Sequence, residues 1–249
     1  MPMNIIDAHS HLWLKQDTWV DGKRILTTTN GRSIFMDEEV QATYPDRFFC
    51  MGMAKNVEEV LAVHKAGLKG IAIPGHRLQG SLLEKMPMFK QMEALGMVLS
   101  MCLADNAHQI GEMAEVIQEC PALKVAIGHF GMVTTPSFEQ QVLLAREGEN
   151  VRIESGGVTW LFNSEFYPYP SAVRSIRRAA ELVGMDRLMW GSDYPRTITA
   201  ITYRMSYDFI CKSKELTDSE KRAFLGENAI QFYGFKNLPE LPYIKNMSE

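Results

Sequence analysis

The chain reads IIDAHSH at residues 5–11, and this stretch decides both the predicted fold and the predicted chemistry. Its apolar start is typical of a buried strand, and two histidines lie at the strand's carboxyl end. Because side chains alternate between the faces of a strand, Asp7, His9 and His11 are expected to point to the same side. Two imidazoles one strand repeat apart can bind a divalent cation, and a nearby carboxylate suits the same charge. The alternative is a polar strand end with two solvated histidines.

Short apolar runs alternate with longer amphipathic stretches along the rest of the chain, which is the pattern of a parallel β/α protein. Seven strands are predicted: Ile5–His11, Phe48–Met53, Gly70–Pro74, Val98–Leu103, Lys124–His129, Val151–Ser155 and Arg187–Asp193. Helices are expected between them, with Asn56 capping one and a capping box from Thr217 to Glu220 opening another. The stretch Gln16–Asp46 is rich in Gly, Thr, Asn and Asp and is expected to form a long loop.

Composition narrows the class of protein and of partner. The chain has 249 residues with a formal net charge of −4, and 46% of its residues are hydrophobic. We expect a single domain over residues 1–249 that binds small molecules, because no basic stripe supports nucleic-acid binding. No run approaches the ~18 apolar residues of a membrane span. The four cysteines lack paired spacing and the N-terminus lacks a signal-peptide pattern, so a cytoplasmic protein is expected.

Two later motifs place polar side chains after apolar strands. Residues 126–131 read AIGHFG, with His129 at a strand end, and residues 188–195 read LMWGSDYP, with Asp193 after a strongly apolar strand. In a β/α barrel these ends meet on one face, where active sites assemble. His129 is then a site residue or else a core or loop histidine. Asp193 binds metal or takes a proton from water, or else caps a turn.

Further candidates follow other strands. Arg77 comes just after Gly70–Pro74, where its guanidinium could bind a substrate carboxylate bidentately, although a surface arginine is an equal reading. The neighbouring His76 could hydrogen-bond to substrate or be a solvated loop residue. Glu154 and Ser155 end another strand, and the alternation of side chains alone does not decide which of them faces inward.

The motifs DAHSH at 7–11, GHFG at 128–131 and WGSDYP at 190–195 together resemble the amidohydrolase superfamily. Within it, YPDRF at 44–48 and the GENA and YG phrases between 226 and 234 are similar to the amidohydrolase family 2 branch of lactonases and decarboxylases. The resemblance implies an α/β fold with a distorted TIM-type (β/α) barrel. It also implies that His9 and His11 bind metal, that His129 polarises the substrate carbonyl or helps to hold metal, and that Asp193 is general base and metal ligand.

The chain departs from this family in two respects. The predicted strand Val98–Leu103, which corresponds to the family's fifth, has no metal-binding histidine, as on the lactonase side of the branch, where some members work without metal. The second strand is also missing, because the first-strand loop runs almost directly into YPDRF. A standard barrel closes with eight strands, so this one has seven or a gap. A gap could be filled by Gln16–Asp46 or by another chain, which favours a homo-oligomer.

The sequence therefore predicts a hydrolase that opens a lactone or similar cyclic ester of a carboxylated sugar acid or aromatic breakdown product. Asp193 would activate water, and one divalent ion, zinc or manganese, is expected on His9, His11 and Asp193, with a metal-free site as the alternative. The second hypothesis is a metal-dependent decarboxylase of an aromatic or enoic acid. The third, of another class, is a non-catalytic barrel that binds a ligand or serves as an assembly subunit.

Overall fold

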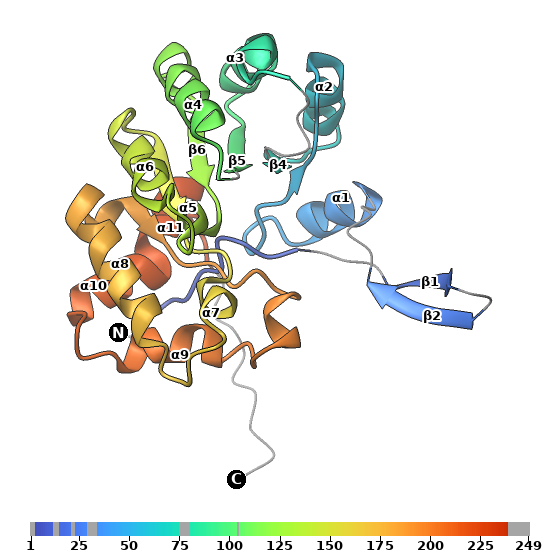
Figure 1. The fold of residues 1–249 in the computed structure, drawn as a ribbon. Helices are drawn as coiled ribbons and strands as arrows, with labels where there is room; N and C mark the ends of the chain where they lie inside the picture. Colours follow the sequence, from blue (N-terminus) through green and yellow to red (C-terminus); the bar gives the residue numbers. More distant parts are fainter. Residues whose placement is uncertain are drawn as a thin grey trace.

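The computed structural model describes residues 3–11, 15–20, 23–28, 34–74, 80–103 and 105–238. Strands and helices alternate along the chain, and the helices cover the outside of a curved parallel sheet (Figure 1). The sheet runs in sequence order through β3 (Met51–Gly52), β4 (Gly70–Pro74), β5 (Val98–Cys102), β6 (Lys124–Ile127), β7 (Val151–Glu154) and β8 (Leu188–Met189). The predicted α/β fold is confirmed, with a sheet that is not closed between β3 and the N-terminal segment.

The longer helices connect these strands or follow them. They are α2 (Val57–Lys65), α3 (Met86–Ala94), α4 (Ala107–Glu119), α6 (Phe138–Leu143), α8 (Pro170–Val183), α9 (Met205–Lys212), α10 (Asp218–Arg222) and α11 (Asn228–Tyr233). Shorter turns are α5 (His129–Met132), α7 (Val158–Leu161), the 3-10 turns Leu83–Lys85, Leu144–Arg146, Met185–Arg187 and Thr197–Thr199, and a π-helical turn at Ala223–Glu227. In the described part of the chain, no helix is both long and apolar enough to cross a bilayer.

Local sequence signals explain where several helices begin. The Asn56 side chain accepts a hydrogen bond from the Glu59 amide at 2.9 Å and caps α2, as predicted. The predicted capping box of Thr217 and Glu220 opens α10, with each side chain accepting from the other's backbone amide. These caps satisfy amides that have no partner within the helix.

The N-terminal segment, residues 5–11, takes the place of a further strand beside β8. It is too irregular to form a strand, although Ser10 and Tyr194 form an isolated parallel bridge. Three backbone hydrogen bonds join it to the chain after β8: Ala8 N to Trp190 O (3.0 Å), Asp193 N to His9 O (2.8 Å) and His11 N to Tyr194 O (2.7 Å). The seven predicted segments are therefore six strands and this irregular one, which together form the open barrel.

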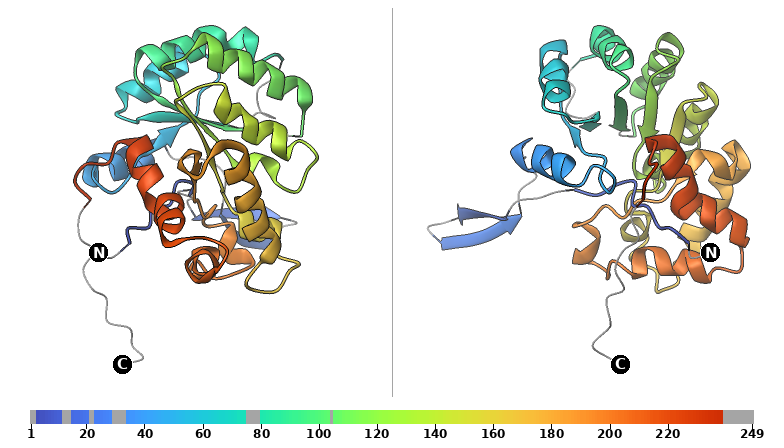
Figure 2. Two further views of the ribbon diagram at one scale, coloured as in Figure 1. Left: turned by 90° about the vertical axis from the view of Figure 1, so that its left-hand side faces the viewer. Right: turned by 180° about the vertical axis from the view of Figure 1, so that it is seen from behind.

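The prediction of a long loop over Gln16–Asp46 is wrong. The region contains an antiparallel pair, β1 (Lys15–Val20) and β2 (Lys23–Thr28), followed by helix α1 (Ile34–Thr43). The two strands project from the body of the molecule (Figure 2). The Asp21-Gly22 dipeptide between them in sequence is a strong signal of a two-residue hairpin connection, and it outweighs the polar composition.

The sheet packs on both of its faces. The larger hydrophobic core lies between the strands and the outer helices and includes Leu99, Ile127 and Ile153, all fully buried. A smaller cluster forms on the other face, where Val98, Ala126 and Met189 meet Ala229 and Phe232 of α11. These apolar side chains fill the inside of the sheet, and the polar residues described below come at or after the carboxyl ends of the strands.

Gly226 tests how the N-terminal segment is held. A Cβ atom at Gly226 would lie 2.1 Å from the Asn4 carbonyl oxygen, and the Ile6 amide donates to the adjacent Leu225 carbonyl at 2.8 Å. Because a backbone atom cannot yield cheaply, we expect Gly226→Ala to lower the unfolding free energy by about 1–3 kcal/mol.

Gly111 is the matched control, because its Cβ would meet nothing within 4 Å in α4. Gly111→Ala is expected to raise stability by about 0.5–1 kcal/mol through helix propensity. Urea unfolding of both variants checks this, and a Gly226→Ala protein as stable as the original would contradict the described contact.

Candidate active site

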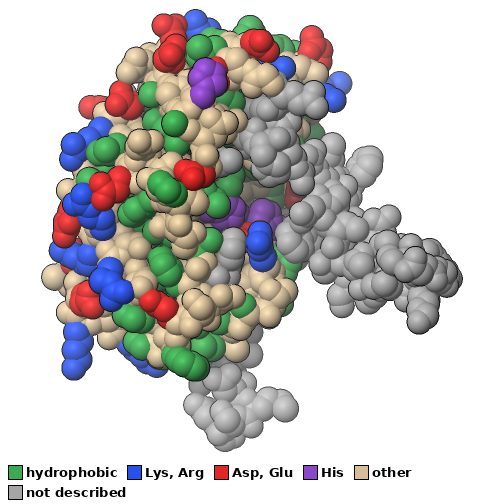
Figure 3. Space-filling view, in the orientation of Figure 1, with side chains coloured by type: hydrophobic (Ala, Val, Ile, Leu, Met, Phe, Trp, Pro, Cys, Tyr) green, Lys and Arg blue, Asp and Glu red, His purple; other side chains and the backbone are tan. Residues whose placement is uncertain are grey.

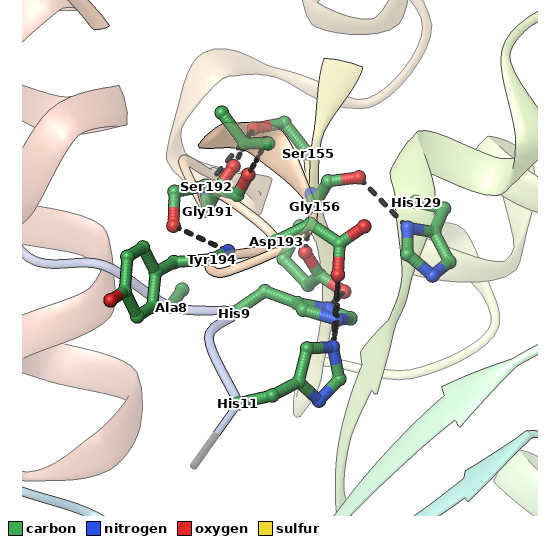
Figure 4. Close-up of polar contacts among 12 residues, drawn as sticks. Ala8, His9, His11, His129, Ser155, Gly156, Gly191, Ser192, Asp193 and Tyr194 are labelled. Atoms are coloured by element: carbon green, nitrogen blue, oxygen red, sulfur yellow. Dashed lines mark hydrogen bonds and ion pairs between the residues drawn. The ribbon is translucent and has the colours of Figure 1, made fainter. Parts of the chain in front are cut away.

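Two histidines and an aspartate converge where the N-terminal segment meets the chain after β8. The Nε2 atoms of His9 and His11 lie 3.2 Å apart, and Asp193 Oδ1 lies 2.9 Å from His11 Nε2 and 3.6 Å from His9 Nε2 (Figure 4). Asp193 is only 2% exposed, whereas the His11 side chain remains open to solvent. Histidine side chains are visible in a recess of the molecular surface (Figure 3).

The spacing of these three atoms fits a divalent metal. Zinc bonds of 2.0–2.1 Å in a tetrahedral arrangement place ligand atoms about 3.3 Å apart, and the observed separations of 2.9, 3.2 and 3.6 Å lie around this value. Two imidazole nitrogens and a carboxylate are ligands that zinc and manganese accept. The group His9, His11 and Asp193 is therefore compatible with one divalent ion, with further coordination positions left for water or substrate.

Glu154 joins this group from β7. The sequence alone does not decide whether Glu154 or Ser155 faces inward. Glu154 is 1% exposed, its Oε1 lies 2.5 Å from His9 Nδ1, and its Oε2 accepts a hydrogen bond from the Gly156 amide at 2.6 Å. Ser155 turns the other way, and its hydroxyl accepts from the Gly191 amide at 3.1 Å. Ile153 is fully buried in the core toward the helices. Because side chains alternate between the faces of a strand, Glu154 points to the face opposite Ile153, which is the inside of the sheet.

The carboxylates control the charge of His9. Burial lowers the pKa of His9, but the charge and hydrogen bond of Glu154 and the charge of Asp193 outweigh it and raise the pKa to about 9. Burial acts on Asp193 as well, but the hydrogen bond to His11 and the neighbouring histidine charges hold the pKa of Asp193 below its ordinary value. Asp193 is therefore ionised at neutral pH.

His129 reaches the same site from α5, immediately after β6. Its ring centroid is 4.8 Å from that of His9, and its Nδ1 lies 2.8 Å from the Gly156 carbonyl oxygen. A carbonyl only accepts hydrogen bonds, so Nδ1 carries the proton. Burial and the charge of His9 lower the pKa of His129, so the ring is neutral at neutral pH and its Nε2 carries no proton. That nitrogen can accept a proton or bind a metal.

His129 and Asp193 both adopt unusual backbone conformations. Their φ angles are 51° and 56°, in the left-handed region that residues other than glycine rarely occupy. Such strain is found preferentially at functional sites, where the surrounding structure holds it in place. In both residues it occurs at the carboxyl end of a strand, where the chain turns into the site.

Asp7 does not join His9 and His11 as the strand pattern predicts. Its carboxylate accepts hydrogen bonds from the Ser192 amide (2.8 Å), the Ser192 hydroxyl (2.6 Å) and the Tyr203 hydroxyl (3.0 Å). The segment is not a regular strand, so strict alternation does not apply to it. Asp7 instead anchors the loop that carries Asp193. Arg77 and His76, the predicted substrate-binding residues, lie outside the described residues, and their roles stay predictions.

In the metal-free chain we expect His9 to titrate near pH 9 and His129 below its ordinary value of 6.5. Because the pKa of His9 is raised by folding, its contribution to stability is complete below pH 6.5 and is lost as the pH rises through about 9. Histidine ring NMR between pH 5 and pH 10 measures both values. A His9 ring that titrates near 6.5 would contradict the described contact with Glu154.

Comparison with known proteins identifies relatives of this architecture. The model of the Amidohydrolase family matches residues 36–235, a range that begins after His9 and His11. No curated protein matches the chain.

Solved structures resemble the fold over much of the chain. A probable 2-pyrone-4,6-dicarboxylic acid hydrolase from Acinetobacter baumannii, with citric acid bound, has 18% sequence identity and a TM-score of 0.68, covering 94% of this chain and 100% of that one. A zinc-bound amidohydrolase from Burkholderia multivorans has 15% identity and a TM-score of 0.62, covering 79% of this chain and 76% of that one.

A third similar structure is the 5-carboxyvanillate decarboxylase from Novosphingobium aromaticivorans, in complex with manganese. It has 18% identity and a TM-score of 0.58, covering 81% of this chain and 68% of that one. At such identities the likeness shows a shared fold, so activity must be argued from the site.

Proposed function

The chain belongs to the Amidohydrolase family, and on that premise we propose that it hydrolyses a lactone or similar cyclic ester of a small carboxylated molecule. The observation that carries this proposal is the buried, ionised carboxylate of Asp193, held by His11 at the carboxyl end of the sheet. The similarity of the fold to a probable 2-pyrone-4,6-dicarboxylic acid hydrolase supports a carboxylated aromatic breakdown product as the substrate, and the lactone of a carboxylated sugar acid is the alternative.

In this proposal Asp193 is the general base. It removes a proton from the water that attacks the ester carbonyl carbon, and it returns this proton to the ring oxygen when the carbon–oxygen bond breaks. His9, His11 and Asp193 would hold one divalent ion, zinc or manganese, which would supply polarisation of the ester carbonyl. Water, lactone and protein thus give a ring-opened acid with no other reactant.

The tautomer of His129 changes the role expected from the sequence. A neutral ring with its proton on Nδ1 has no N–H at Nε2 with which to polarise a carbonyl. We therefore assign Nε2 of His129 the role of accepting a hydrogen bond from the attacking water beside His9, or of binding the ion. Arg77 and His76 remain the proposed partners of the substrate carboxylate.

A decarboxylase is the second candidate, because a manganese-bound decarboxylase shares the fold. It fits this chain less well. The resemblance to the family associates decarboxylation with a metal-binding histidine on the fifth strand, and β5 ends in Cys102 instead. Burial, with the charges of Glu154 and Asp193, raises the pKa of Cys102 to about 12, so this residue offers a thiol rather than a thiolate.

We expect Asp193→Asn to reduce lactone opening by about 10²- to 10⁴-fold with the fold retained, because the asparagine amide cannot accept the proton. The assay follows loss of the pyrone absorbance of 2-pyrone-4,6-dicarboxylate together with acid release. Asp208→Asn is the control, because Asp208 pairs with Lys212 on α9 at 2.6 Å, away from the site. Near-normal activity of Asp193→Asn would contradict the assignment.

Product analysis separates the three hypotheses. Acid release without CO₂ from a lactone panel supports the hydrolase, and CO₂ release from aromatic or enoic acids supports the decarboxylase. A folded chain that is inert toward both panels, and whose fold and lack of activity do not change on His9→Ala, would favour a non-catalytic barrel.

A further inference from the structure

Glu154 occupies a pocket that three glycines make for it. Gly128, Gly156 and Gly191 follow β6, β7 and β8, and Figure 4 shows the last two beside His9. A Cβ atom at Gly128 would lie 2.8 Å from Glu154 Oε1, and Cβ atoms at Gly156 and Gly191 would lie 2.9 and 3.2 Å from Oε2. Three neighbouring strands are therefore each followed by a glycine, which has no side chain, at the point where the Glu154 carboxylate lies.

The same glycines make room for His9. A Cβ atom at Gly191 would lie 2.6 Å from His9 Cβ, and one at Gly156 would lie 2.8 Å from His9 Nδ1. Contacts below 3.0 Å require a shift of one partner, and both side chains are largely buried, His9 at 11% and Glu154 at 1% exposure. The pair of Glu154 and His9 is thus held in one place by the ends of the strands.

The two oxygens of Glu154 have fixed roles. The Gly156 amide can only donate, so Oε2 accepts from it at 2.6 Å. Oε1 then accepts from Nδ1 of His9 at 2.5 Å, which places the proton of a neutral His9 on Nδ1. The lone pair of Nε2 is left facing His11 and Asp193, as a metal ligand requires.

We propose that Glu154 is the positioning residue of this site: by holding the Nδ1 proton of His9 it sets the affinity of His9, His11 and Asp193 for a divalent ion. At 1% exposure Glu154 itself does not reach substrate. The inference rests on the proposed function only in taking the same three residues as the metal site. Its test therefore measures metal binding and not turnover.

Glu154→Gln is a sharp test because the contacts around residue 154 fix the orientation of the glutamine side-chain amide. The Gly156 amide still needs an acceptor, so the glutamine oxygen takes that position and its NH₂ group faces His9 Nδ1. A zinc ion on Nε2 requires the remaining proton of His9 to be on Nδ1, where it would face the glutamine NH₂ group, donor against donor. We expect zinc to bind about 10- to 100-fold more weakly, measured by competition with a chromogenic chelator on the metal-free protein above pH 9, where His9 of the unmodified chain is neutral.

Glu112→Gln is the matched control. Glu112 is also a buried carboxylate, at 6% exposure, and it accepts from the Leu82 amide at 2.9 Å and contacts His108 Nε2 at 3.2 Å. Glu112 belongs to α4 and not to the candidate metal site. An effect on zinc affinity that came only from losing a buried charge would therefore appear in both variants. We expect the zinc affinity of Glu112→Gln to stay within about twofold of the original.

A spectroscopic measurement on the unmodified chain makes the test independent of variant folding. Long-range ¹H–¹⁵N spectra of the histidine rings in the zinc-loaded protein should show His9 protonated at Nδ1 and coordinated at Nε2. A proton on Nε2, equal zinc affinity of a folded Glu154→Gln protein, or no zinc binding by the unmodified chain would each overturn the proposal. If zinc binds as expected but no lactone is opened, only the proposed function fails.

Discussion

The backbone hydrogen bonds between the N-terminal segment and the chain after β8 are the constraint on which the site depends. They bring His9 and His11 to Asp193 across more than 180 residues of sequence, and they run between the ligands themselves, since the Asp193 amide donates to the His9 carbonyl. Gly226 allows the N-terminal segment to approach the π-helical turn Ala223–Glu227, and the Asp7 carboxylate fixes the loop that carries Asp193. The ligand spacing therefore follows from the way the open barrel is assembled.

Buried charge is the second feature of the site. Glu154 and Asp193 are nearly inaccessible, and burying unpaired carboxylates would be costly, so each has a histidine partner. The glycines after β6, β7 and β8 leave room for the pair of Glu154 and His9 between the strand ends. The same arrangement keeps His129 neutral and Asp193 ionised, which gives the two residues different capacities at neutral pH.

The sequence predicted the repeating part of the fold and most of the candidate site. Apolar runs located β4 at its observed bounds and the other sheet strands to within a few residues, and motif positions at strand ends indicated His9, His11, His129 and Asp193. The features that could not be predicted from the sequence depend on contacts between distant segments. The orientation of Asp7 follows from an irregular backbone, and the tautomer of His129 is set by a carbonyl that follows β7. The pairing of β1 with β2 departs from the loop that polar composition predicts, and its sequence signal is the Asp-Gly dipeptide between the two strands.

Zinc-edge anomalous diffraction from crystals of the zinc-treated chain tests the central claim most directly. We expect one strong peak between His9 Nε2, His11 Nε2 and Asp193 Oδ1, with Glu154 still in contact with His9 Nδ1. No peak at this position, or a zinc ion held by other side chains while these three keep their metal-free contacts, would contradict it.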